Sequence, residues 1–209
     1  MNTTADTLTV YSDYVCPFCY LGRKSLERYQ ATRGSELEID WRPFDLRSQK
    51  RNPDGSIDHS VDDGKSDEYY EQAERNVRRL REKYDVEMAM EIATDVDSLP
   101  AQIAAYYVKQ HYPYGTWLKF DRAVFEALWR EGADIGDEGV LVELAEESGV
   151  DGAKISSTLD DESFRARVRE RFAEAQRDGV TGVPTFTYDG HAARGAVPPE
   201  QLRRLVEGA

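Results

Sequence analysis

Cys16-Pro17-Phe18-Cys19 is the stretch that decides how this chain folds. It follows a β-forming run at residues 8–11 and a polar turn at Ser12-Asp13, and it leads directly into a helical pattern over residues 20–29. Two cysteines three positions apart in the first turn of a helix lie on the same side, close enough to form a disulfide. The strand, turn and helix therefore predict a paired dithiol at the start of a helix.

The two thiols are expected to differ in environment. Cys16 is expected at the helix N-terminus, where unpaired N–H groups and the positive helix end favour the thiolate and lower its pKa. Cys19 is expected one turn deeper and shielded from solvent. Pro17 fits the first turn, because its missing N–H has no intrahelical partner to lose. An exposed, acidified thiol backed by a second thiol is the minimum needed for thiol–disulfide exchange.

Two other interpretations of the cysteine pair stay open. Zinc usually takes four ligands, but the chain has no further cysteine and only His59, His111 and His191, which are not spaced as ligands. We therefore predict no metal site. Two cysteines can also coincide by chance as small buried apolar residues, although the strand–turn–helix context disfavours this.

The charge balance limits the possible partners. The 209 residues include 27 basic and 40 acidic side chains, a net charge of −13 at neutral pH. Because phosphates are bound by basic surfaces, nucleic acid is disfavoured as a partner. The basic run at residues 75–81 is interleaved with glutamates, which indicates a solvated helix face. An acidic surface poor in lysine is typical of halophilic proteins, with an ordinary acidic cytosolic protein as the alternative.

The sequence also predicts where the protein works. It has no run of about 18 apolar residues, so we predict no membrane span. Residues 1–6 lack the basic start and the apolar stretch of a secretory signal, and the only two cysteines share one motif. We therefore expect a cytoplasmic protein whose cysteine pair is catalytic rather than structural. Whether it is a monomer or a homodimer stays open.

The remaining pattern predicts an α/β protein whose sheet is interrupted by helices. A second strand is expected at 36–41, ended by Pro43, and a hairpin at 185–188 and 191–194. Helices are expected at 66–84, from 98, at 116–130, at 137–149, from 151, at 163–178 and from 198 to the end. We predict one discontinuous domain, residues 1–45 and 180–209, and a helical insertion, residues 46–179, whose last helix, 163–179, can pack on the first domain.

Two loops draw attention. Residues 45–64 are rich in Asp, Gly, Pro and Ser and predict a long loop, which either gates a site or is an ordinary surface excursion. In the stretch 179–186, Pro184 cannot donate a hydrogen bond within a strand. It is therefore expected at a strand start, an edge or a bend.

Four stretches together resemble a known family. They are Ser12-Asp13-Tyr14-Val15-Cys16-Pro17-Phe18-Cys19-Tyr20-Leu21-Gly22, Trp41-Arg42-Pro43-Phe44, Phe125-Glu126-Ala127-Leu128-Trp129 with Gly132-Ala133-Asp134-Ile135-Gly136-Asp137, and Gly179-Val180-Thr181-Gly182-Val183-Pro184-Thr185-Phe186. Over nearly its whole length the chain resembles the DsbA-like thioredoxin family. Within it, the likeness is to the FrnE-like subgroup, related to 2-hydroxychromene-2-carboxylate isomerases and kappa-class glutathione transferases.

The resemblance implies a thioredoxin-like fold with a large inserted all-α domain that roofs the thiols. It also implies that the bond before Pro184 is cis, which leaves the Val183 backbone free to pair with an extended substrate. The isomerase and transferase relatives usually carry serine where this chain has Cys16, so both cysteines together favour redox chemistry. A further departure is Gln102, where relatives often have histidine.

We predict a thiol–disulfide oxidoreductase with no cofactor beyond the redox-active Cys16–Cys19 disulfide. Cys16 forms a mixed disulfide with protein or small-molecule thiols and disulfides, and Cys19 resolves it. Pro17 and Phe18 contact substrate and tune the reduction potential. Asp13 either caps the turn or, if close in space, raises the energy of the thiolate.

Two alternatives to this function stay open, as does the direction of electron flow. The first is an isomerase or transferase that depends on a small, glutathione-like thiol. The second is a holding chaperone that binds unfolded chains on the apolar helical cap.

Overall fold

The structure is a computed structural model that describes residues 6–62, 64–89 and 95–208. The elements in chain order are β1 (Asp6–Ser12), α1 (Pro17–Thr32), β2 (Leu37–Pro43), the 3₁₀ turn η1 (Ser48–Lys50), α2 (Asp67–Lys83), α3 (Leu99–His111), α4 (Tyr114–Glu126), the π-helical turn η2 (Ala127–Glu131), α5 (Glu138–Glu147), α6 (Gly152–Leu159), α7 (Glu162–Arg177), β3 (Thr185–Tyr188), β4 (His191–Arg194) and α8 (Pro199–Glu207). This order confirms the predicted sequence of a β-α-β unit, a helical block and a β-β-α unit.

Four of the eight α-helices among the described residues begin with a side-chain cap. Ser66, Asp137, Asp151 and Asp161 each accept a hydrogen bond from a backbone N–H in the first turn of α2, α5, α6 and α7. The helix predicted over 116–130 is present, with small differences at its two ends. It begins two residues earlier, directly after an extended Pro113, and its last turn widens into the π-helical η2.

The sheet brings the ends of three strands together on one side of the molecule. Its strand order is β2-β1-β3-β4, with β1 parallel to β2 and antiparallel to β3. Ser12 pairs with Pro43, and Tyr11 pairs with Thr185. The carboxyl ends of β1 and β2 and the start of β3 therefore meet at the same edge. The segments directly beyond them, which hold both predicted site motifs, lie next to one another.

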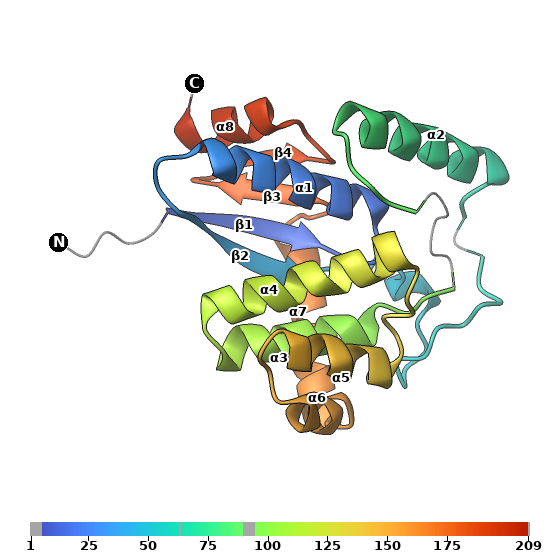
Figure 1. The fold of residues 1–209 in the computed structure, drawn as a ribbon. Helices are drawn as coiled ribbons and strands as arrows, with labels where there is room; N and C mark the ends of the chain where they lie inside the picture. The colour runs from blue at the N-terminus through green and yellow to red at the C-terminus, as the bar shows by residue number, and fades with distance from the viewer. Residues whose placement is uncertain (1–5, 63, 90–94, 209) are drawn as a thin grey trace.

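The helices do not form a single bundle. Figure 1 shows α3 to α6 gathered near the β2 edge, while α2 lies apart from them and packs on α1. Helix α7 contacts both β2 and α3. The predicted boundaries at residues 45/46 and 179/180 stay a prediction. Within the described residues, no helix combines the length and the hydrophobicity needed to span a bilayer.

A buried polar contact joins α1 to α4. The Arg23 guanidinium donates to Asp121 Oδ2, and the Tyr14 hydroxyl donates to Asp121 Oδ1 at 3.0 Å. The carboxylate is 1% exposed and the arginine side chain 8% exposed. Because an unpaired buried charge is costly, this contact fixes the position of α4 relative to the cysteine helix.

Candidate active site

Cys16 is the N-cap residue of α1. Its backbone is extended (φ −89°, ψ 112°), and its carbonyl accepts the first helical bonds, from Cys19 N at 3.0 Å and Tyr20 N at 3.3 Å. Pro17 occupies the first helical position, as predicted, and the Cys16 N–H donates to the Asp13 carbonyl at 3.2 Å. The turn and the helix start therefore hold the Cys16 backbone from both sides.

Both thiols are buried, which corrects the expectation that Cys16 is exposed. Cys16 is 4% and Cys19 0% exposed, and the two are not joined by a disulfide. The cover comes from packing across the sheet edge, since Cys16 Sγ lies 3.6 Å from the Val183 carbonyl oxygen and donates to it. Phe18 and Val183 are half-buried beside it. Their partial exposure makes them the accessible surface next to the sulfur.

The Val183–Pro184 segment stands directly before β3. The peptide bond between these two residues is cis, the isomer that the resemblance implies. The Pro184 carbonyl accepts a hydrogen bond from Gly195 N at 2.8 Å, and the Thr185 hydroxyl donates to the Gly182 carbonyl at 2.7 Å. The two stretches selected from the sequence therefore meet at one sulfur–carbonyl contact, between residues 167 positions apart in the chain.

Asp13 caps the turn, and its charge acts on the inner thiol. Its carboxylate is fully buried and accepts from Val15 N at 3.3 Å, from Leu46 N at 2.9 Å and from the Ser98 hydroxyl. Loss of solvation is the main cause that raises the pKa of Asp13 to about 6. Burial also raises the pKa of the Cys19 thiol well above its ordinary value, and the Cys16 sulfur and the Asp13 carboxylate add to the rise.

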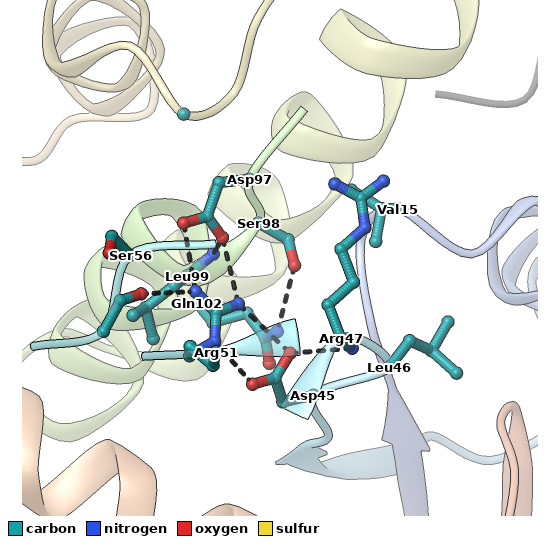
Figure 2. A network of polar contacts seen from close by, with 12 residues as sticks. Val15, Asp45, Leu46, Arg47, Arg51, Ser56, Asp97, Ser98, Leu99 and Gln102 are labelled. Carbon is teal, nitrogen blue, oxygen red and sulfur yellow. Dashed lines mark hydrogen bonds and ion pairs between the residues drawn. The ribbon is translucent and has the colours of Figure 1, made fainter. Parts of the chain in front are cut away.

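A polar cluster near Asp13, made of Asp45, Arg51 and Asp97, was not predicted from the sequence. Figure 2 shows Arg51 between the carboxylates of Asp45 and Asp97, with Arg51 Nε 2.7 Å from Asp45 Oδ2 and Nη2 3.0 Å from Asp97 Oδ1. Asp45 is almost fully buried, and its charge contributes to the raised pKa of Asp13. The position of Asp45 could have been a signal in the sequence, because it comes two residues after β2, which ends beside the site. Its cationic partner lay in a stretch interpreted as a loop.

Gln102 lies in the same region, inside α3. Its Nε2 donates to the Phe44 carbonyl at 3.1 Å and to the Ser98 hydroxyl at 3.3 Å. Its Oε1 is buried and has no hydrogen-bond partner among the described residues. The predicted loop 45–64 contains η1 and an isolated bridge between Arg51 and Ile57, so its first part is anchored beside the site.

A cavity lies elsewhere in the molecule. It has a volume of about 450 Å³ and is bounded by α1, β2 and α4, with Leu26, Ile39 and Tyr114 among its walls. Neither cysteine borders it. Within the described part of the chain, no three histidine, cysteine or acidic side chains are grouped closely enough to hold a metal ion. The reactive groups of the site are therefore two thiols, a buried carboxyl group and a backbone carbonyl.

The fold and this site define a family. The family model described as DSBA-like thioredoxin domain matches residues 7–207, and the chain belongs to that family. The protein YwbO of Bacillus subtilis (strain 168) is 30% identical over 200 residues, which cover 95% of this chain and 94% of YwbO.

Solved structures share the fold. The probable DsbA oxidoreductase SCO1869 from Streptomyces coelicolor has a TM-score of 0.78 at 23% identity, covering 97% of this chain and 88% of its own. A 2-hydroxychromene-2-carboxylate isomerase has a TM-score of 0.75 at 21% identity, covering 95% and 92%. The predicted family and the predicted thioredoxin-like fold are confirmed.

Proposed function

We propose that this protein is a thiol–disulfide oxidoreductase in which Cys16 reacts with substrate and Cys19 resolves the mixed disulfide. The observation that supports it best is the 3.6 Å contact between Cys16 Sγ and the Val183 carbonyl oxygen. An extended substrate that pairs its backbone with Val183 brings its own sulfur to Cys16. No cofactor beyond the cysteine pair is needed, and the substrates are protein or small-molecule thiols and disulfides.

The exchange proceeds in two balanced steps. In the reducing direction, the Cys16 thiolate attacks one sulfur of a substrate disulfide, and the other substrate sulfur leaves as a thiolate and takes up a proton. The Cys19 thiolate then attacks Cys16 Sγ, and the bond between Cys16 and the substrate breaks. Two electrons pass to the substrate, and the enzyme is left with a Cys16–Cys19 disulfide, which an external dithiol reduces. The reverse order oxidises a substrate dithiol.

Asp13 supplies the proton acceptor that the second step needs. Burial disfavours the Cys19 thiolate, so this thiol needs a proton acceptor close by. The Asp13 carboxylate is buried, and its charge acts on the Cys19 thiol. Its pKa, raised to about 6, leaves it largely ionised at neutral pH. Asp13 accepts the Cys19 proton as Cys19 attacks, and it returns the proton when the disulfide is reduced.

The test compares two single-sulfur variants. Dithiothreitol-dependent reduction of insulin is measured for wild type, Cys16→Ser and Cys19→Ser. We expect Cys16→Ser to fall to the uncatalysed rate. Reduced Cys19→Ser, freed of dithiothreitol and mixed with oxidised insulin, is expected to accumulate one covalently bound substrate chain per protein, detected by mass spectrometry after acid quenching. Cys16→Ser with wild-type activity would reject the proposed mechanism.

One observation favours a second candidate, a small-thiol-dependent isomerase. The fold matches that of a 2-hydroxychromene-2-carboxylate isomerase over most of both chains. An isomerase that uses a free small thiol has no need of a resolving cysteine. Glutathione-dependent isomerisation of a hydroxychromene carboxylate that survives Cys19→Ser would favour this candidate. Loss of this isomerisation in Cys19→Ser would favour the oxidoreductase.

A further inference from the structure

Gly22 occupies an unexpected position in α1. It lies one turn beyond Cys19, in the interior of the helix, and it is buried. Glycine lowers helix stability relative to alanine at such positions, because it loses more backbone freedom on folding. Its helical backbone is one that any residue can adopt, so conformation does not require glycine here. The need for glycine at this position must therefore come from the atoms packed around it.

The space beside Gly22 is filled by the segment that approaches Cys16. A Cβ at this position would lie 3.2 Å from Pro184 Cγ and 3.1 Å from Phe186 Cζ. Both separations are shorter than ordinary carbon–carbon contacts of about 3.5–4.0 Å. The absence of a side chain therefore allows the two rings to rest directly on α1.

The two neighbours differ in how easily they can move. Phe186 is fully buried on β3, between Val10 and Ala193 in the sheet register. Displacing its ring disturbs the core. Pro184 is also buried, but it stands outside the strand and follows the half-buried Val183, so we expect this end of the segment to move before Phe186 does. Its carbonyl is tied to Gly195 N by a single hydrogen bond of 2.8 Å.

We propose that Gly22 is a positioning residue, which seats the Val183–Pro184 segment on α1 and so sets the distance between Cys16 and the backbone that pairs with substrate. The inference rests on the proposed function for its catalytic consequence, but not for its structural one. A methyl group at residue 22 moves the Val183 backbone away from Cys16. Extended substrates then bind less well, while the sulfur chemistry at Cys16 and Cys19 is retained.

The test uses Gly22→Ala with Gly115→Ala as the matched control. Gly115 is also helical, is exposed, and has no atom within 4 Å of a Cβ built on it. For reduction of a disulfide-containing peptide, we expect Gly22→Ala to raise KM about five-fold, the effect of weakening one backbone hydrogen bond. Its kcat should stay within about two-fold of wild type. Iodoacetamide should alkylate Cys16 faster than in wild type, because packing against Val183 is what covers this thiol. Gly115→Ala should match wild type throughout.

A second readout is independent of activity. Amide hydrogen exchange at Gly195, measured by NMR, should be faster in Gly22→Ala than in wild type or in Gly115→Ala, because its acceptor Pro184 is displaced. Wild-type KM together with wild-type exchange at Gly195 would overturn the inference. If wild type itself reduces no peptide disulfide, the proposed function fails, and the exchange rate alone decides whether Gly22 seats the segment.

A further variant covers the case in which Gly22→Ala does not fold. Adding Phe186→Leu removes the ring atom closest to the new methyl group and leaves the Pro184 contact in place. The double variant should fold and keep the raised KM. A folded double variant with the KM of Phe186→Leu alone would overturn the inference.

Discussion

Replacing Asp13 with asparagine should change how stability depends on pH. The folded protein holds this carboxyl at a pKa of about 6, against 3.8 for an ordinary aspartate. Between these values the native state binds more protons at this site than the unfolded state does. The contribution of Asp13 to stability is therefore most favourable below pH 4 and declines as pH rises to about 6. The asparagine side chain does not titrate, so Asp13→Asn removes this decline.

The expected change in the free energy of unfolding follows from the shift in the pKa of Asp13. A change of about two pKa units corresponds to about 3 kcal/mol between the two protonation states. Asparagine keeps the shape and one acceptor oxygen, but it loses part of the hydrogen bonding from Leu46 and Ser98, at a cost of about 1 kcal/mol that does not depend on pH. The stability of Asp13→Asn relative to wild type should therefore increase by about 3 kcal/mol from pH 4 to pH 7.

Urea unfolding of the reduced proteins at pH 4, 5, 6, 7 and 8 measures this difference directly. Asp161→Asn provides a control that should stay nearly flat over this range, because hydrogen bonds from Ser163 and Phe164 lower the pKa of that exposed N-cap carboxyl from its ordinary 3.8. Asp161 stabilises above its ordinary pKa, and this is lost as pH falls. A difference between Asp13→Asn and wild type that stays flat from pH 4 to pH 8 would refute the reasoning, and with it the role of Asp13 as proton acceptor for Cys19.

Three further outcomes are expected. Asp121→Ala leaves Arg23 buried without its carboxylate, so urea unfolding should show a loss of about 3–5 kcal/mol, partly recovered by adding Arg23→Met; no recovery would contradict the ion-pair explanation. Arg51→Met leaves the buried Asp45 without its cation and should speed proteolysis within residues 45–58, whereas unchanged cleavage would show that the cluster does not anchor this segment. With a net charge of −13, the Tm should rise between 0.1 M and 1 M NaCl, as the screening length falls from about 10 to 3 Å; a falling Tm would contradict net repulsion between surface carboxylates.

Local signals made much of the fold predictable. A proline and a cysteine pair at a helix start, aspartates before helices and a two-residue turn between short strands act over a few residues, and the structure has each where the sequence indicated it. The resemblance to the DsbA-like thioredoxin family also implied that Pro184 lies near the cysteine pair, and the contact between Cys16 and the neighbouring Val183 agrees with it. Cofactor use, the residues that bind substrate and the cellular location stay predictions.

The rest depends on contacts between distant parts of the chain. The burial of Cys16 results from packing against Val183, and no pattern near residue 16 reports it. Arg51 seemed part of a polar loop, yet it is held by two carboxylates, one of them 46 residues away. Gly22 belongs to the first of the stretches that carry the family resemblance, but no pattern near it shows which atoms surround it. What excludes a side chain there is a segment from the other end of the chain.

Two indole rings also touch the turn that precedes Cys16. Trp41 Nε1 donates to the Ser12 hydroxyl at 2.9 Å, and Trp129 Nε1 donates to the Tyr14 carbonyl at 2.8 Å. Two of the three tryptophans in the chain therefore contact the turn that leads to Cys16. Because thiols and disulfides quench indole fluorescence differently, the tryptophan emission intensity should change when the cysteine pair is oxidised, and this can be measured without any attached dye.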